Sequence, residues 1–215
     1  MTTKEKILAQ ALILFNEKGV ETITTRQIAM ALGMSQGNLC YHFPKKKAII
    51  IALYKQLVAK FDSLYEELSS PEPSEGEKES SKLAISNFLK IIQITNQYFV
   101  DYKFLMLNFV QIMRWYPTIK THYQALTIQR NEQTIDLFNT FQVAGLFIKE
   151  TYQGQYAHIC EQFMILNNFW LSHAEILHEG NNSEKIKHFN QLVGAFIYPY
   201  LTTQGQKAYK AAMKK

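Results

Sequence analysis

The residues best suited to chemistry lie in one short run, TTRQIAMALGMSQGNLCYHF, over residues 24–43. Within it, the amides of Gln36 and Asn38 can pair with adenine in the major groove of DNA, and Gly37 between them permits close approach. Hydroxyl, imidazole and cationic side chains on both sides suit phosphate oxygens. The pattern therefore predicts a DNA-contacting surface made of Thr25, Arg26, Ser35, Gln36, Gly37, Asn38, Tyr41, His42 and Lys46.

Two helices must position this surface, and the apolar residues of the run supply the seam between them. The predicted seam residues are Ile28, Leu32, Met34 and Leu39. Ala29 keeps the two backbones close, Gly33 can take the left-handed conformation of a tight turn, and Ser35 caps the second helix. An ordinary αα-hairpin of a bundle is the alternative. The helix-turn-helix is favoured because seam, turn glycine, capping serine and local charge agree.

The net charge of +5 is concentrated at the N-terminal end of the chain. Residues 1–55 carry eight basic and three acidic side chains, whereas the rest of the chain carries fifteen of each. A basic N-terminal segment followed by a neutral remainder is typical of a protein that binds a polyphosphate such as DNA through one end. A solvated lysine face is the alternative interpretation.

The segment ITTRQIAMALGMSQGNLCYHFPKKKAI resembles the signature of the TetR (tetracycline repressor) family of transcriptional regulators. The resemblance covers about residues 5–52. It implies a repressor with an N-terminal helix-turn-helix, an effector pocket among the following helices, and a dimer formed by the last two long helices. The residues that match the signature in order are Thr25, Ile28, Ala29, Gly33, Ser35, Gly37, Tyr41, His42, Phe43 and Lys46.

Three residues depart from the family pattern. Leu32 replaces the usual alanine and Met34 the usual valine, which should change only the packing volume of the seam. Cys40 stands where the family usually has a tyrosine that touches a phosphate, so that role is not carried over. Tyr41 is a candidate to supply the missing contact.

Apolar residues recur at three- and four-residue spacing throughout, which predicts an all-α fold. We expect a helix-turn-helix domain over residues 1–48, with a fourth helix leading out of it from about 45, and a helical effector-binding and dimerisation domain over 49–215. The composition of residues 69–81 predicts an acidic loop. The expected helices cover about 2–19, 25–32, 36–42, 45–68, 82–101, 103–115, 118–141, 152–178 and 184–202, with a short terminal helix possible after Gly205.

Of the 28 aromatic residues, 24 lie beyond residue 55, and many of them crowd residues 98–123. An aromatic and methionine lining is typical of a pocket for a flat or apolar ligand, although any one of these residues could simply be core. Asn108, Gln111 and Arg114 could supply polar anchors. The candidate ligand-binding residues are Tyr98, Tyr102, Phe109, Met113, Trp115 and Tyr123.

The predicted partners are a palindromic DNA operator, a small-molecule effector and a second copy of the chain. A C2 dimer presents two recognition helices about one DNA turn apart, as a palindrome requires. Gly194 and Ala195 would let the dimer helices approach closely. The candidate dimer residues are Ile159, Phe163, Leu166, Phe169 and Trp170 in one segment and Phe189, Leu192, Val193, Phe196 and Ile197 in the next.

No motif for a nucleophile, a phosphate-binding glycine loop or a catalytic acidic pair is present, so we expect neither an enzyme nor a cofactor. The four histidines of the dimer segments lack metal-ligand spacing, so no metal site is expected. Cys40 and Cys160 predict free thiols and a cytoplasmic protein, and the sequence offers no membrane span. Two other readings remain open. One is a DNA-binding architectural regulator whose helical domain binds another protein; the other is a helical enzyme or lipid carrier with a vestigial head.

Overall fold

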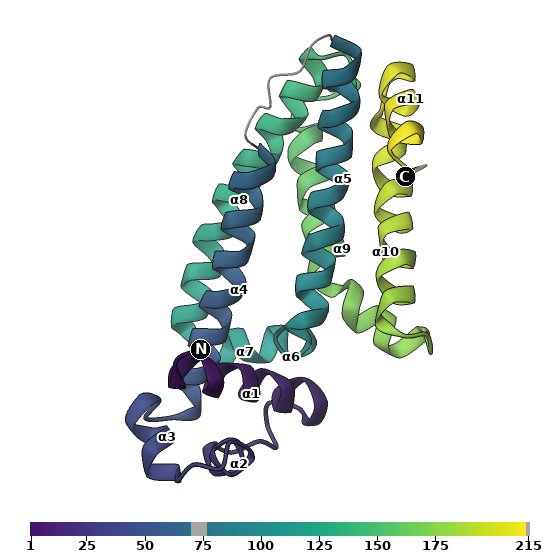
Figure 1. The fold of residues 1–215 in the computed structure, drawn as a ribbon. Helices are drawn as coiled ribbons and strands as arrows, with labels where there is room; N and C mark the ends of the chain where they lie inside the picture. Colours follow the sequence, from purple (N-terminus) through teal and green to yellow (C-terminus); the bar gives the residue numbers. More distant parts are fainter. Residues whose placement is uncertain (70–76, 214–215) are drawn as a thin grey trace. The chain divides into compact units, whose positions relative to one another are not determined.

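The computed structural model describes residues 1–69 and 77–213, and within these ranges the chain is built from helices without a strand (Figure 1). The predicted all-α fold is confirmed. The helices are α1 Thr3–Lys18, α2 Thr25–Ala31, α3 Gln36–His42, α4 Lys46–Ser69, α5 Glu77–Asp101, α6 Lys103–Leu107, α7 Phe109–Trp115, α8 Pro117–Val143, α9 Gln155–Leu177, α10 Asn182–Ile197, the 3-10 helix η1 Tyr198–Tyr200 and α11 Thr203–Ala212.

Three predicted boundaries differ from those observed. The single helix expected over 103–115 is two helices, because the backbone leaves helical geometry at Asn108, whose Nδ2 donates to the Phe104 carbonyl at 2.8 Å. The helix expected to reach residue 202 ends at Ile197, where Pro199 enters a 3-10 turn. The acidic loop expected over 69–81 is shorter, since Ser69 ends α4 and residues 77–81 open α5. Residues 70–76 lie outside the described residues.

The described chain divides into two compact units. Unit 1 comprises Met1–Asp62 and Tyr98–Thr121, and unit 2 comprises Ser63–Gln97 and His122–Lys215. Helices α4, α5 and α8 each contribute residues to both units.

Unit 1 joins the first three helices to the segment that contains α6 and α7. Phe15 of α1 packs against Phe104 with ring centroids 5.1 Å apart, and both side chains are fully buried. The Asn16 amide ties the same two segments: its Nδ2 donates to the Asp101 carbonyl at 2.7 Å, and its Oδ1 accepts from the Phe104 amide at 2.9 Å. The segment 98–121 is therefore part of the core on which the N-terminal helices are built.

Unit 2 is stabilised where the α8–α9 connection meets the α10–α11 connection. The Ile148 amide donates to the Tyr200 carbonyl at 2.9 Å, and the Thr202 amide donates to the Leu146 carbonyl at 3.0 Å. Phe138 and Phe147 stack beneath this junction with centroids 4.7 Å apart. These contacts hold the ends of α8, α10 and α11 together.

Candidate functional site

Local capping signals define both helices of the predicted helix-turn-helix. The Thr24 hydroxyl accepts from the Gln27 amide at 3.3 Å, while Gln27 Oε1 accepts from the Thr24 amide at 2.8 Å, so a capping box opens α2. The Ser35 hydroxyl accepts from the Asn38 amide at 3.1 Å and caps α3. Between the helices Gly33 has φ +65°, the left-handed conformation expected of the turn.

The predicted seam is the buried face of this helix pair. Ile28, Ala29 and Leu39 have 1% or less of their surface exposed, and Leu32 and Met34 pack against the same core. Because these apolar side chains occupy the inner face, the polar residues of α3 have to point outward.

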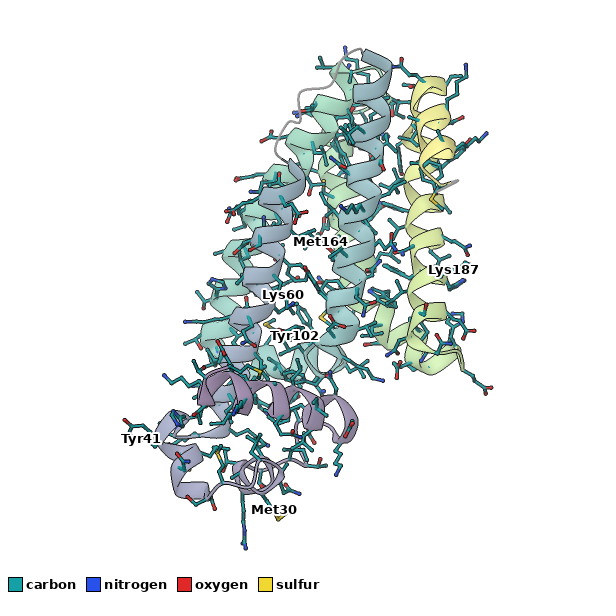
Figure 2. All side chains as sticks on the ribbon, viewed as in Figure 1. Met30, Tyr41, Lys60, Tyr102, Met164 and Lys187 are labelled. Atoms are coloured by element: carbon teal, nitrogen blue, oxygen red, sulfur yellow. The ribbon has the colours of Figure 1, made fainter. Side chains whose placement is uncertain are left out.

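The outward face of α3 carries the candidate base-contacting residues. Gln36, Gly37 and Asn38 are exposed. Tyr41 is 84% exposed and extends away from the helices, as Figure 2 shows. The His42 ring lies 5.2 Å from the Tyr41 ring and is half-buried. The structure thus places polar groups of α3 together on one accessible surface.

The flanking candidates lie at the starts of the helices. Thr25 is half-buried in the first turn of α2, and Arg26 next to it is exposed. Ser35 is exposed; its hydroxyl accepts from the Asn38 amide as the α3 cap and keeps its own hydrogen to donate, but it carries no charge. Arg26 is therefore the best placed of the three for an electrostatic contact with a phosphate.

The ammonium group of Lys46 bonds to main-chain carbonyls of the protein itself. Its Nζ donates to the main-chain carbonyls of Val20 at 2.8 Å, Ile23 at 2.9 Å and Glu21 at 3.3 Å. These carbonyls accept from all three hydrogens that an ammonium can offer. Burial lowers the pKa of Lys46, and the charge of Glu21 opposes this shift. The side chain ties the start of α4 to the α1–α2 connection.

The neighbouring lysines have other surroundings. Lys45 is exposed, and the Lys47 ammonium lies 5.9 Å from the centre of the Tyr116 ring, within unit 1. Lys45 and Lys47 are thus both exposed, unlike Lys46, and the family pattern singled out neither.

The six candidate ligand-binding residues are not gathered in one unit. Five of them belong to unit 1, where Tyr102 is buried in the core. Tyr98 lies beside Phe61, with centroids 5.7 Å apart, and Lys60 Nζ is 4.9 Å from the Tyr98 ring centre. Tyr123 belongs to unit 2, where its hydroxyl accepts from Asn168 Nδ2 at 2.7 Å. The five in unit 1 are Tyr98, Tyr102, Phe109, Met113 and Trp115.

Sequence reasoning missed a group of buried polar residues in unit 2. Asn96 is fully buried, and its Nδ2 donates to Asn190 Oδ1 at 2.7 Å. Among the side chains that the structure describes, four buried atoms have no hydrogen-bond partner: the Oδ1 atoms of Asn96, Asn131 and Asn167, and Nε1 of Trp170. Asparagines in helices carry no recognisable sequence signal, so only packing could reveal them.

Comparison with known proteins gives two family matches on this chain. Residues 7–53 match the model described as bacterial regulatory proteins of the tetR family, and residues 65–209 match the model of the TetR bacterial transcriptional repressor. The chain belongs to the TetR family of bacterial transcriptional regulators.

Curated relatives of this TetR-family chain match it over about a quarter of its length. The class D tetracycline repressor of Escherichia coli is 37% identical over 57 residues, and the regulator RutR of Escherichia coli K12 is 40% identical over 55 residues. Each match covers 26% of this chain and 26% of the relative, so it spans about a quarter of either protein.

Solved structures match the whole fold. A TetR-family regulator from Marinobacter aquaeolei VT8 has a TM-score of 0.81 and 23% identity, with 100% of this chain and 98% of that chain covered. A putative regulator from Saccharomonospora viridis in complex with choline has a TM-score of 0.67 and 18% identity, covering 93% and 97%. The SmeT–triclosan complex has a TM-score of 0.63 and 16% identity, covering 94% and 93%.

In this TetR-family chain the two long C-terminal helices bury about half of the candidate dimer residues within the protomer. Gly194 lies against Tyr209 of α11, so its small size serves a contact inside the chain. Several large apolar side chains of the two helices remain exposed. The buried candidates are Ile159, Trp170, Phe189, Val193 and Ile197, and the exposed apolar residues are Ile165, Phe169, Ile176, Leu177 and Leu192.

The next candidates for chemistry are the histidines and cysteines of the described residues, whose side chains could bind a metal ion or, for the cysteines, react as thiols. The His178 ring lies 4.6 Å from that of His188 and 6.1 Å from that of His173, but among the described residues no cluster suited to a metal ion is found. Burial raises the pKa of the Cys160 thiol to about 11, whereas Cys40 is partly accessible. Within residues 1–69 and 77–213, no helix has the length and apolar character to cross a membrane.

Proposed function

We propose that this regulator binds a palindromic operator as a homodimer and is released from it by a small, largely apolar ligand. The observation that carries the proposal is the exposed polar face of α3, with Gln36, Asn38 and Tyr41 accessible over a buried seam. Release from the operator would be a population shift, because the ligand binds more tightly to the conformation with low affinity for DNA.

At the operator, Gln36 and Asn38 would read base edges, and Gly37 would allow the helix to approach them. Contacts to the sugar-phosphate backbone would come from the hydroxyl, imidazole and guanidinium groups around α3. Lys46 would act on this surface indirectly, by fixing the α1–α2 connection. The proposed backbone-contacting residues are Thr25, Arg26, Ser35, Tyr41 and His42.

The homodimer would use the exposed apolar side chains of α9 and α10. Ile165, Phe169 and Ile176 are 57%, 43% and 80% exposed on α9, and Leu192 is 40% exposed on α10. Apolar surface of this extent on two adjacent helices is typical of a protein–protein contact.

The binding of a small ligand is supported by two structural relatives of the same fold, one in complex with choline and one with triclosan. In this chain the ligand region that we favour lies in unit 2, which holds Tyr123 and the buried polar atoms without a hydrogen-bond partner. The aromatic residues of unit 1 stay predictions as ligand contacts.

The experiment is selection of bound sequences from a random duplex library at near-physiological salt. We expect a palindrome, with Gln36→Ala and Asn38→Ala relaxing the preference at individual positions by roughly 1–3 kcal/mol each. Gln124→Ala is the matched control, because Gln124 is an exposed glutamine on α8 in unit 2. Recovery of no motif, or unchanged selection in both α3 variants, would contradict the assignment.

The competing function is an architectural regulator whose helical domain binds another protein. It is less favoured because buried, unpaired polar atoms inside unit 2 suit a small ligand and are out of reach of a docking protein. A palindrome recovered together with a complete lack of response to small molecules would favour this alternative.

A further inference from the structure

Four helices of unit 2 meet at one level along their axes. Asn168 of α9 bonds to Tyr123 of α8, and two residues later Trp170 stacks on Phe189 of α10 with centroids 4.6 Å apart and planes at 13°. Asn190, the next residue of α10, accepts from Asn96 of α5. These contacts place the side chains of α5, α8, α9 and α10 in a single layer. We call it the polar layer: Asn96, Tyr123, Asn167, Asn168, Trp170 and Asn190.

Three atoms of the polar layer lack a hydrogen-bond partner. They are Oδ1 of Asn96, Oδ1 of Asn167 and Nε1 of Trp170. Asn96 is 0% exposed and Trp170 is 3% exposed, so bulk water does not reach either side chain. An unpaired buried polar group loses its hydration without compensation, and such groups call for a partner that the protein itself does not supply.

The types of these atoms restrict what the partner can be. The two amide oxygens require hydrogen-bond donors, whereas the indole N–H requires an acceptor. A primary carboxamide can donate to both oxygens and accept from the indole, and a hydroxyl can donate to one of the oxygens and accept from the indole. The partner must also be small enough to reach the middle of a helical unit.

The charge of the surrounding side chains further restricts which chemical groups can bind to the polar layer. Among the described residues, the buried polar side chains are amides, Asn96 and Gln155. Lys185 and Glu175, which lie on α10 and α9, pair with each other at 2.7 Å. A cation or anion in the layer would therefore be buried without a counter-charge, which is strongly unfavourable. An uncharged group fits, and the stacked Trp170 and Phe189 suit an aromatic or aliphatic body next to it.

We propose that the polar layer of unit 2 recognises the uncharged hydroxyl or carboxamide group of an otherwise apolar effector. The inference rests on the proposed ligand response and adds to it the chemical class of the ligand. It concerns helix positions that the sequence signature does not reach.

The test uses the full chain and four compounds with one ring system: 2-naphthol, 2-naphthamide, naphthalene and 2-naphthoate. The chain has two tryptophans, so its NMR spectrum should show two indole N–H signals, and Trp170→Phe assigns them. We expect 2-naphthol or 2-naphthamide to shift the Trp170 signal and raise the melting temperature. Naphthalene and 2-naphthoate should bind roughly tenfold more weakly or worse, the size expected for one lost hydrogen bond.

Two variants separate recognition from simple packing. Trp170→Phe keeps the aromatic stack but removes the N–H, and it should weaken binding of the polar compounds roughly tenfold. The control Tyr152→Phe, which removes an exposed hydroxyl of unit 2, should not weaken it. Asn167→Leu removes an unpaired buried oxygen, so it should raise the melting temperature of the free protein while it weakens binding.

Three results would overturn the proposal. Naphthalene could bind as tightly as 2-naphthol, or both polar compounds could leave the Trp170 signal unmoved at millimolar concentration. Asn167→Leu could lower the melting temperature, which would indicate that an ordered water fills the layer. Because operator binding is measured separately in the library selection, an intact operator with an unmoved Trp170 signal refutes this inference alone.

Discussion

Replacing Lys46 by methionine removes the ammonium group and keeps most of the side-chain volume. In the structure this ammonium donates to three carbonyls of the α1–α2 connection at 2.8, 2.9 and 3.3 Å. A hydrogen bond to a charged group contributes about 1.5–3 kcal/mol when it is well buried. Lys46 is only half-buried, and water can reach the carbonyls once the ammonium is gone. We therefore expect Lys46→Met to lower the free energy of unfolding by about 1–3 kcal/mol in total.

For a chain of this size, that change corresponds to a drop in melting temperature of roughly 2–12 °C. Differential scanning calorimetry of Lys46→Met measures it, and Lys45→Met is the matched control, because Lys45 is an exposed neighbour on the same turn. The control should melt within about 2 °C of the unmodified protein.

Operator binding measured across a salt series then separates two roles for Lys46. If it ties the α1–α2 connection, Lys46→Met weakens binding without changing the slope of log K against log salt. If it contacts a phosphate, each subunit loses about 0.9 from that slope. An unchanged melting temperature together with a slope reduced by about two per dimer would refute the reasoning.

Three further predictions concern the turn, the thiols and the dimer. Gly33→Ala should destabilise the chain by about 1–2 kcal/mol in urea titration, because φ is +65° there and a methyl group would meet no atom within 4 Å, leaving only backbone strain. At pH 8 a thiol reagent should label Cys40 and leave Cys160 unreacted, because the pKa of Cys160 is raised to about 11. Since an unfolded thiol titrates near 8.5, the unfolded chain loses its proton first as the pH rises from about 8.5 to 11. The free energy of unfolding should therefore fall over that range. Cys160→Ala should remove the fall between about pH 8.5 and 10; above about pH 10 four tyrosines with raised pKa values contribute as well. Ile176→Glu should give a monomer in sedimentation experiments, whereas Ile128→Glu, at another exposed isoleucine on α8, should leave the dimer intact; the same mass for both variants would contradict the proposed interface.

The N-terminal helices could be predicted from sequence because their signals are local. Thr24, Gly33 and Ser35 act within three or four residues of themselves, so spacing alone identifies the caps and the turn. The break at Asn108 was missed because apolar spacing continues through it, and the amide that bonds to Phe104 could equally have pointed to solvent.

The side-chain partners could not be predicted in the same way. The sequence predicts Lys46 as a phosphate contact from its charge, but it does not give the direction of the side chain, and the carbonyls that the ammonium meets lie more than twenty residues earlier. Asn96 and Asn190 are separated by 94 residues, and their pairing depends on how α5 and α10 pack. Such contacts become visible only when distant segments are placed together.

The two contacts of Asn16 with the segment 98–121 have a consequence for engineering chimeric regulators. The simplest exchange of the DNA-binding helices would cut the gene just after the segment that matches the N-terminal family model, near residue 53. In this chain that cut would separate Phe15 from Phe104, and the Asn16 side chain would lose its two bonds to Asp101 and Phe104. A functional graft should instead transplant two separate pieces of coding sequence, residues 1–62 and 98–121, because the recognition module is discontinuous.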